Sequence, residues 1–446
     1  MERVQVTGIM VKKKNIAGPE DITVLKQRAE QGNIEAQLTL AGIYESGLIT
    51  EQNYGLAIRW FLAAARQGSA KAQATLAEKY LHGYGVDQDY EKAVYWYDKA
   101  AKQNDADAIA SLGWCHQNGL FFKQDYTVAC KWYKKAADLG HLNACYNLAY
   151  MYAEGLGTKK NSKKALHWYM KAARQGHRKA QLNVGTIYEK GIGVAKDNIE
   201  AAEWYRRAAE QEYSKAQYNL ASMYNRGLGV PKDHAQAAIW YLKSAKQGYF
   251  RAQYITGIYY LRGIGVAQDY AEALDWLLKS AEQGYHKAQY QVGKMYLEGL
   301  GIAADHAEAM MWFQHAAAQG YDRAQFRLGE LYTDGVAVKQ DYKRALDCFR
   351  NAAEQGFVPA QYRLSLCYAR GQGVEQDYVQ AYRWCYAAAR ANQSYVLKTL
   401  ENIASKIDAL NLAEASRQGE DLVAKFTAIA ATDGLSETTE TDIEEY

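Results

Sequence analysis

The sequence predicts an all-α solenoid of stacked helix pairs, and the main evidence is a 36-residue unit that occurs ten times. One column carries the register without an insertion: Trp60, Trp96, Trp132, Trp168, Trp204, Trp240, Trp276 and Trp312, then Cys348 and Trp384. Each unit holds two stretches with small and apolar residues three and four positions apart, which is typical of helices with one buried face. Because one such pair cannot bury its apolar face alone, successive units have to stack.

The first helix of each unit is expected to carry its core residues as in Ala72, Leu76, Ala77 and Tyr80, and to end at a glycine. That glycine is present in every copy, at Gly47, Gly83, Gly119, Gly155, Gly191, Gly227, Gly263, Gly299, Gly335 and Gly371. A glycine just past a helix end adopts the left-handed conformation that satisfies the last carbonyls. The column therefore predicts ten helix ends.

The second helix of each unit is expected to begin at an Asp or Asn six residues later, because such side chains cap helix amino ends. These residues are Asn53, Asp89, Asp125, Asn161, Asp197, Asp233, Asp269, Asp305, Asp341 and Asp377. The helix then runs on alanine and aromatic residues and ends at a second turn, usually Gln-Gly as at Gln67-Gly68. The alanines let two helix backbones approach closely, and the Trp-Tyr pair fills the volume between units.

The repeated string A-Q-x-x-L-G/A-x-x-Y-x-x-G-x-G-V-x-x-D-Y-x-x-A-x-x-W-Y-x-x-A-A-x-Q-G resembles the Sel1-like repeat, a relative of the tetratricopeptide repeat. Residues 216–248 carry nearly all of it, and the resemblance covers roughly residues 20–432. It implies a right-handed α/α superhelix with a concave groove lined by the first helices. It also implies a binding scaffold or adaptor rather than an enzyme.

The unbroken register predicts one elongated domain with five parts. They are a flexible extension (1–19), an amino-terminal cap made of a lone second helix (20–35), ten repeats (36–395), carboxy-terminal capping helices (396–432) and a disordered acidic tail (433–446). The third repeat is the least regular, since Asn104, Ile109, His116 and Phe121-Phe122 replace common residues. Its altered loop is either a local contact surface or drift within a tolerant solenoid.

Charge and hydropathy exclude some classes of partner. The formal net charge is +3 over 446 residues, which predicts neither nucleic-acid binding nor a membrane-surface partner. Residues 1–19 hold no apolar run typical of a signal peptide, and no stretch approaches the length of a membrane span. A cytoplasmic protein is therefore expected, with export by a leaderless system as the alternative.

The sequence indicates no catalytic chemistry, cofactor or metal site. Its six cysteines fall in columns otherwise held by core residues and lack the regular pairing of the disulfide-bridged branch of the resembled family, so free thiols are expected. The nine histidines show no metal-ligand spacing. The recurring Gly-Leu-Gly-Val joins helix to helix, whereas a dinucleotide motif needs a preceding strand.

The predicted binding face lies on first-helix columns that the core does not dictate. We call the column Tyr146, Leu182, Tyr218, Tyr254, Tyr290, Phe326, Tyr362 the ladder column; Trp114 and Tyr150 stand in the column four residues further on. Nearby columns add Arg226, Arg262, Arg327, Arg363 and Arg370. By analogy with tetratricopeptide repeats these side chains face a concave groove, where the rings would anchor a partner and the arginines would suit an acidic peptide. The alternative is that the tyrosines merely pack between neighbouring first helices.

Three functions remain open from the sequence. The first is a non-enzymatic protein-interaction scaffold, in particular a bacterial adaptor or an immunity protein that sequesters a toxin. The second is a secreted effector that engages host proteins, for which the acidic tail is the only support. The third is an enzyme like the cysteine-rich, β-lactamase-like branch of the resembled family, and the missing cysteine pattern counts against it. Partner identity and oligomeric state stay unassigned.

Overall fold

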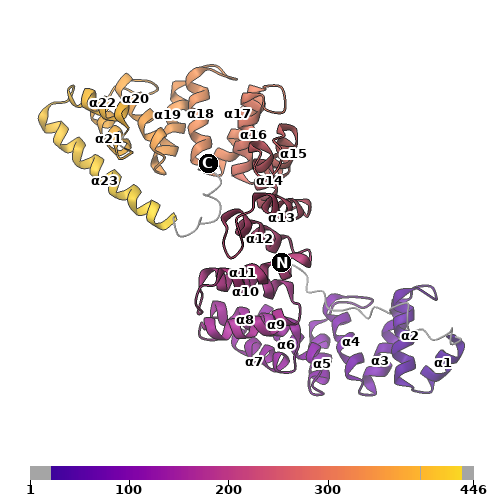
Figure 1. Ribbon diagram of the computed structural model, residues 1–446. Coiled ribbons are helices and arrows are strands. Elements are labelled where there is room, and N and C mark those ends of the chain that lie inside the picture. The colour runs from indigo at the N-terminus through magenta and orange to yellow at the C-terminus, as the bar shows by residue number, and fades with distance from the viewer. Residues whose placement is uncertain (1–21, 392, 434–446) are drawn as a thin grey trace. The chain divides into compact units, whose positions relative to one another are not determined.

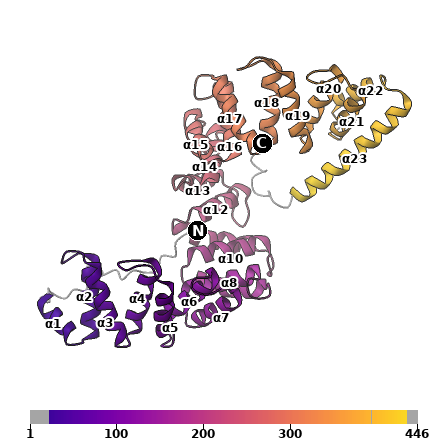
Figure 2. The same ribbon diagram turned by 180° about the vertical axis from the view of Figure 1, so that it is seen from behind.

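The computed structural model describes residues 22–391 and 393–433, which fall into two compact units that divide the chain after Gln211 (Figure 1). The predicted flexible extension (1–19) lies outside the described residues, as does the predicted disordered tail (433–446) except for Asp433, which is the last residue of the final helix. The described part is entirely helical, with no strand. Within each unit consecutive helices pack against one another, as Figure 1 and the reverse view in Figure 2 show, except that the last helix packs against α21 (Tyr378–Ala389) rather than against α22 (Ser394–Ala404). The prediction of an all-α helix-pair solenoid is confirmed.

The first unit holds eleven helices that begin with a lone helix and continue as five pairs. They are α1 (Ile22–Glu30), α2 (Ile34–Ser46), α3 (Tyr54–Arg66), α4 (Ala70–His82), α5 (Tyr90–Ala101), α6 (Ala106–Asn118), α7 (Tyr126–Asp138), α8 (Leu142–Glu154), α9 (Ser162–Arg174), α10 (Arg178–Lys190) and α11 (Asn198–Glu210). Even-numbered helices are the first helices of the repeats, and odd-numbered helices from α3 on are the second.

The second unit holds twelve helices with the same alternation. They are α12 (Ser214–Arg226), α13 (His234–Lys246), α14 (Phe250–Arg262), α15 (Tyr270–Glu282), α16 (His286–Glu298), α17 (His306–Ala318), α18 (Asp322–Asp334), α19 (Tyr342–Glu354), α20 (Val358–Arg370), α21 (Tyr378–Ala389), α22 (Ser394–Ala404) and α23 (Ala409–Asp433). The long α23 packs against α21 through Phe426, which contacts Trp384. It therefore covers apolar surface on the last repeat.

Both helix boundaries predicted from the repeat are confirmed. The glycine after each first helix has a φ between +63° at Gly47 and +76° at Gly155. Each predicted Asp or Asn cap accepts a hydrogen bond from a backbone N–H in the first turn of its second helix, as Asp89 does from Lys92. Local sequence signals thus set where the helices start and stop.

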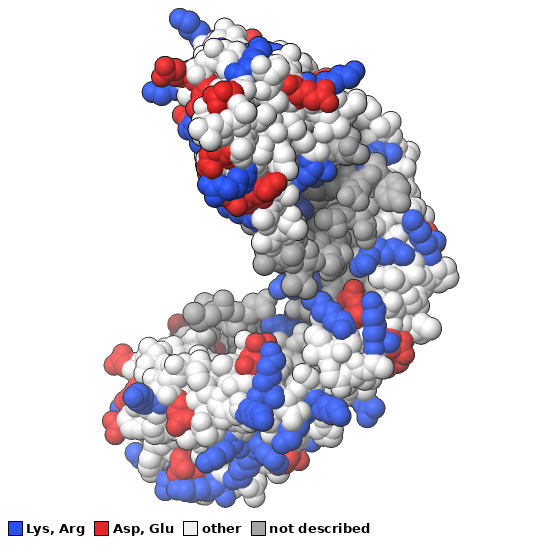
Figure 3. Space-filling model, turned by 90° about the vertical axis from the view of Figure 1, so that its left-hand side faces the viewer, with Lys and Arg blue, Asp and Glu red and all other residues white. Residues whose placement is uncertain are grey.

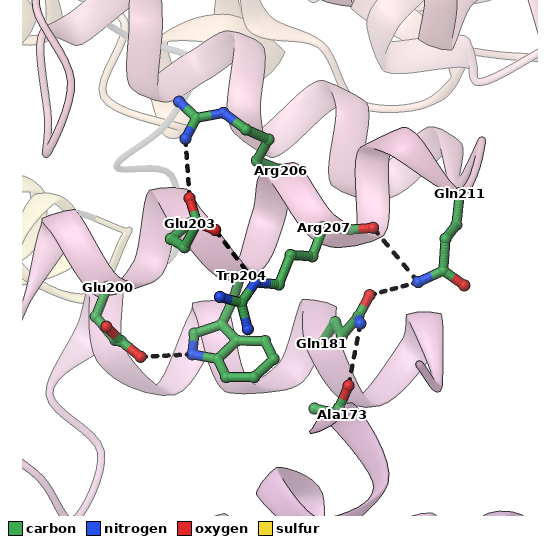
Figure 4. A network of polar contacts seen from close by, with 8 residues as sticks. All are labelled: Ala173, Gln181, Glu200, Glu203, Trp204, Arg206, Arg207 and Gln211. Atoms are coloured by element: carbon green, nitrogen blue, oxygen red, sulfur yellow. Dashed lines mark hydrogen bonds and ion pairs between the residues drawn. The ribbon is translucent and has the colours of Figure 1, made fainter. Parts of the chain in front are cut away.

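A row of glutamines, most of them buried, links three helices at most repeat junctions and holds neighbouring repeats together. The first-helix glutamines Gln37, Gln73, Gln181, Gln253, Gln289, Gln325 and Gln361 donate to a carbonyl at the end of the preceding second helix. In Figure 4, Gln181 donates to the Ala173 carbonyl (3.0 Å) and accepts from Gln211 (2.7 Å). A buried amide with both ends bonded is a stabilising element of the core.

The glutamine row also has exceptions that follow from the sequence. In the third repeat Ile109 takes the glutamine position and Leu139 stands where its glutamine partner would be, so the polar pair is replaced by an apolar one. In the last repeat Ala391 holds the partner position of Gln361, and the fully buried Oε1 of Gln361 has no hydrogen-bond partner among the described residues. We call each such glutamine pair a rung of the glutamine row; its two residues lie 30 positions apart in the sequence.

The amino-terminal caps of the first helices change type between the units. In the first unit a polar side chain accepts the capping bond, at Asn33, Ser69, Asp105, His141 and His177. In the second unit the same column is Tyr213, Tyr249, Tyr285, Tyr321 and Phe357, and none of these makes a side-chain capping bond. The second unit replaces capping bonds with aromatic packing.

One core position carries an unsatisfied hydroxyl, and removing it is expected to stabilise the protein. Thr256 is 3 % exposed in a column that holds Val184 and Val292, and its Oγ1 has no hydrogen-bond partner among the described residues. Thr256→Val should raise the free energy of unfolding by about 1–2 kcal/mol, because valine has the same shape without the desolvated hydroxyl. Urea denaturation followed by circular dichroism measures the change. Thr186→Val is the matched control, because Thr186 Oγ1 bonds the Leu182 carbonyl at 3.1 Å; an equal gain in both variants would contradict the explanation.

Candidate protein-interaction face

The predicted ladder column forms a packed aromatic row in the second unit. Each of its rings contacts the aromatic residue at the start of the next first helix, with centroids 5.3 Å apart for Tyr218–Tyr249 and 5.2 Å for Tyr254–Tyr285. The pairs Tyr290–Tyr321 and Phe326–Phe357 repeat the arrangement at 5.4 Å. Such edge and tilted contacts are favourable ring geometries. The column therefore helps to join neighbouring repeats.

Two ladder residues differ from the expectation that the column lies opposite the core. Tyr218 is 5 % exposed and Tyr254 is 2 % exposed, since each ring is covered by the aromatic residue that starts the next helix. Tyr218 also contacts the second-helix residue Tyr241. These two tyrosines therefore pack between neighbouring first helices, as the alternative interpretation of the sequence had it. Their rings offer almost no surface to a partner.

The later ladder residues are half-buried and keep part of the ring at the surface. Tyr290, Phe326 and Tyr362 lie on α16, α18 and α20. The Tyr362 hydroxyl lies 3.3 Å from Thr399 Oγ1. The two tyrosines combine an apolar ring with a polar hydroxyl, which suits an interface anchor, whereas Phe326 offers an apolar ring alone.

In the first unit the predicted residues are fewer but more accessible. Tyr146 is half-buried and its ring stacks on His177 at 4.7 Å. Tyr150, four residues further along α8, is 43 % exposed, and Trp114 on α6 is half-buried. The structure therefore brings Tyr146 and Tyr150 onto one helix, one turn apart.

The five predicted arginines all lie on first helices of the second unit. Arg262 and Arg370 are exposed in the last turns of α14 and α20, and Arg226 is half-buried in the last turn of α12. Arg327 pairs with Glu330 at 2.8 Å. Arg363 lies over the Phe349 ring at 5.6 Å. Exposed positive charge thus concentrates at Arg262 and Arg370.

The aromatic column that starts the first helices of the second unit is absent from the residues predicted from the sequence. Tyr249, Tyr285, Tyr321 and Phe357 follow the turn glycine and recur every 36 residues, so the spacing could have revealed them. Each of them contacts one ring of the ladder column, at centroid distances of 5.2 to 5.4 Å. Any binding face on these helices includes them.

The cap residue His177 predicts an acid-sensitive first unit. Its Nδ1 accepts from the Ala180 N–H at 3.1 Å, which requires a neutral ring. Burial, with Lys179 and Arg178 nearby, lowers the pKa of His177 to about 4. The unfolded chain protonates near pH 6.5, so stability is fully present above that pH and is lost as the pH falls toward 4.

The loss of unfolding free energy between these pH values is expected to be about 1–2 kcal/mol, after allowance for the partly exposed ring. His177→Asn keeps a capping acceptor that does not titrate and should remove most of this loss. Urea denaturation at pH 7 and pH 4.5 measures the difference. An identical pH dependence in both proteins would show that His177 is not the titrating group.

Burial raises the pKa of all six cysteine thiols. Burial raises the pKa of Cys115 to about 12 and that of Cys348, Cys367 and Cys385 to about 11, so these thiols are protonated at neutral pH. All six cysteines are free thiols. In the described part of the chain no group of three His, Cys, Asp or Glu residues could hold a metal ion. Of the described helices, none is long and apolar enough to cross a membrane.

Comparison with known proteins identifies the repeat. The family model described as the Sel1 repeat matches ten consecutive segments from residue 34 to residue 393. No curated protein sequence matches the chain significantly.

Several solved structures are similar. The protective antigen c5321 of uropathogenic Escherichia coli, which displays the SLR fold, is 35 % identical with a TM-score of 0.82, covering 93 % of this chain and 90 % of that chain. A Sel1 repeat protein from Oxalobacter formigenes is 31 % identical with a TM-score of 0.55, covering 70 % of this chain and 90 % of that one. The immunity protein Pa5087 from Pseudomonas aeruginosa is 21 % identical with a TM-score of 0.31, covering 48 % and 81 %.

Proposed function

The chain belongs to the Sel1 repeat family, and from this premise we propose that it is a non-enzymatic scaffold that binds an acidic, extended protein segment along the first helices of its second unit. Proteins with this repeat generally mediate protein interactions. More specifically, we propose that the protein acts in the bacterial cytoplasm, either as an adaptor or as an immunity protein that sequesters a toxin. The similar proteins from Escherichia coli and Oxalobacter formigenes support a bacterial setting. The unpaired cysteines support a reducing compartment.

The observation that carries the proposal is the combination of half-exposed rings and arginines on α16, α18 and α20. Tyr290, Phe326 and Tyr362 keep ring surface, and Arg370 adds an exposed positive charge. Tyrosine and arginine are enriched among residues that dominate binding energy at interfaces. A row of such residues, repeated at each first helix, favours an extended ligand over a compact one.

The proposal is tested by reversing the two exposed arginine charges. Arg262→Glu with Arg370→Glu should abolish or weaken by about tenfold the capture of an acidic partner from the native cell, because both lie on the proposed face. Lys243→Glu with Lys246→Glu on α13 is the matched control, since these residues are also exposed and lie in a last helix turn. Affinity capture with mass spectrometry compares both variants with the wild type. Identical partner sets in all three proteins would contradict the proposed face.

A second candidate is an exported protein that engages host proteins. Its support is the similarity to c5321, which is described as a protective antigen, because such an antigen has to be encountered by the host. A translocation reporter fused to the chain with and without residues 433–446 tests it. Transport that requires this segment would favour the exported protein, and no transport in either form would leave the cytoplasmic scaffold.

A further inference from the structure

Exposed apolar residues gather at one edge of the first unit, on the turns that join first helices to second helices. In the first three repeats, six large apolar residues lie on these turns or at the start of the following helix, and they are between 37 % and 69 % exposed. We call them the apolar edge: Leu48, Ile49, Tyr54, Tyr84, Tyr90 and Phe121. In the fourth and fifth repeats the columns of Ile49 and Tyr54 hold small or polar residues, at Gly157, Gly193, Ser162 and Asn198. The apolar edge is therefore not a general feature of the repeat.

Phe121 has a backbone conformation that suits glycine. Its φ is +66°, and the equivalent positions hold Gly85, Gly157 and Gly193 with φ between +63° and +77°. A bulky side chain in this left-handed region costs free energy. Core packing does not compensate, since Phe121 is 53 % exposed and its ring contacts only that of Phe122 among the described residues, with centroids 5.0 Å apart. A strained residue with an exposed ring indicates a contact surface, which is one of the two interpretations of this irregular turn.

The turns of successive repeats lie against one another, so the apolar edge is continuous. A Cβ at Gly85, in the second repeat, would lie 2.6 Å from the Cβ of Tyr54, which begins the second helix of the first repeat. The same close approach recurs in the later repeats of the unit. Phe121 holds the position of Gly85 in the third repeat, and Tyr90 begins the preceding second helix. The six side chains therefore form one row across three repeats.

We propose that the apolar edge joins two copies of this chain as a two-fold dimer. Since a large apolar side chain has about 200 Å² of surface, the six residues together expose about 600 Å². The largest apolar patch on a typical monomer is about 300–600 Å² and is often functional. A standard interface takes about 800 Å² from each partner. The apolar edge therefore supplies most of the surface that such a dimer needs, and the polar residues around it supply the rest.

The charges at the two ends of the apolar edge fit this symmetry. Glu51 lies at the first-repeat end and Lys123 at the third-repeat end; both are exposed, and neither forms an ion pair among the described residues. A two-fold axis perpendicular to the row brings the same residues of the two copies together in opposite directions. Lys123 of each copy then faces Glu51 of the other. The edge is thus complementary to itself in apolar surface and in charge.

A membrane surface fits the apolar edge less well. Glu51 and Asp87 are exposed beside the rings, whereas an anionic lipid surface attracts basic residues. The exposed positive charge of the first unit gathers on α9 instead, where Lys163, Lys164 and Arg174 form a basic face. Figure 3 shows Lys and Arg side chains gathering along the lower margin of this unit. The acidic residues at the apolar edge therefore favour a protein partner.

Sedimentation equilibrium of the full-length chain tests the proposal. The wild type should reach twice its mass of 50.1 kDa at about 100 µM and dissociate on dilution. Phe121→Gly should raise the dimer dissociation constant at least about tenfold, because it removes an exposed ring from the contact. Glycine suits the left-handed backbone, so the urea midpoint of the monomeric variant should equal or exceed that of the wild type. Ala337→Gly is the matched control: this residue holds the same position in the ninth repeat with a φ of +67°, and its replacement should leave the dissociation constant unchanged.

Charge reversal identifies the partner as a second copy. Glu51→Lys or Lys123→Glu alone should raise the dissociation constant about fivefold, whereas a chain with both changes should return to the wild-type value, because the pair forms again with its signs exchanged. A wild type that stays monomeric up to about 100 µM would overturn the proposal. A dimer that Phe121→Gly leaves unchanged would also overturn it. Binding of phosphatidylglycerol vesicles by a monomeric wild type, lost in Phe121→Gly, would assign the apolar edge to a membrane instead.

Discussion

Replacing Gly157 with alanine is expected to lower the free energy of unfolding by about 3 kcal/mol, the largest single-site effect in the first unit. Gly157 lies in the turn between α8 and α9 with a φ of +63°. A Cβ at this position would lie 2.2 Å from the carbonyl carbon and oxygen of Tyr126, at the start of α7. Because these are backbone atoms, one of the two repeats has to move.

The control for this prediction is Gly176→Ala. It distinguishes the free-energy cost of a left-handed backbone conformation from the cost of a steric clash of the new Cβ. Gly176 has a φ of +90°, but a Cβ there meets no atom within 4 Å. Gly176→Ala should lower the free energy of unfolding by about 1 kcal/mol, because only the left-handed conformation disfavours alanine there. The chain accepts non-glycine residues in this column at Asn104 and Glu212, with φ of +62° and +56°. Urea denaturation followed by circular dichroism compares the variants, and equal losses would contradict the contact explanation.

Breaking one rung of the glutamine row is expected to lower the free energy of unfolding by about 2–3 kcal/mol. Gln181→Ile removes the donor to the buried Ala173 carbonyl and the acceptor for Gln211 (Figure 4). The carbonyl then stays in the core without its partner. Urea denaturation measures the loss. Gln175→Leu is the control in the same unit, because Cys145 stands where Gln175 would need a glutamine partner. Gln175 donates only to the Lys171 carbonyl, so this substitution should lower the free energy of unfolding by less than about 0.5 kcal/mol.

The paired substitution Gln181→Ile/Gln211→Leu reproduces the apolar rung that the third repeat already has at Ile109 and Leu139. Gln211→Leu alone should cost about 1 kcal/mol, because it leaves the Gln181 oxygen unpaired, but should cost nothing further once Gln181 is isoleucine. A double-mutant cycle gives the coupling free energy. Strict additivity of the two substitutions would show that the pair does not act as a unit.

Helix positions and the stacking principle were predictable because local chemistry sets them. Glycines such as Gly47, which end the first helices, and caps such as Asp89, which begin the second helices, act within one turn of their helix. The local sequence is therefore enough to predict these helix boundaries. The spacing of the first-helix glutamines, such as Gln181, places them on the core face of the helix. It does not predict which residues they bond to. The bond from Gln211 to Gln181 joins residues 30 positions apart, and only the packed structure shows it.

The binding face was harder to predict because exposure depends on neighbours in three dimensions. Helical spacing alone places Tyr254 and Tyr290 in one column, yet Tyr254 is 2 % exposed while Tyr290 keeps part of its ring at the surface. Both rings make the same kind of contact with the aromatic residue that begins the next first helix, at 5.2 Å for Tyr254–Tyr285 and 5.4 Å for Tyr290–Tyr321, so neither the column nor this contact predicts the exposure of each ring. Charge behaves similarly, since the near-neutral total of +3 hides the basic face of α9 and the acidic residues after Lys425.

Site-specific photo-crosslinking tests the central claim, that partners bind along the first helices, most directly. A photoreactive residue at Arg262 or Arg370, on first helices of the second unit, is compared with one at Ile199 or Ile239, which are exposed at 72 % and 46 % on second helices. The proposal predicts a specific cross-linked protein from Arg262 or Arg370 in the native cell and none from the second-helix positions. A partner that cross-links to Ile199 or Ile239 but to neither first-helix position would contradict it.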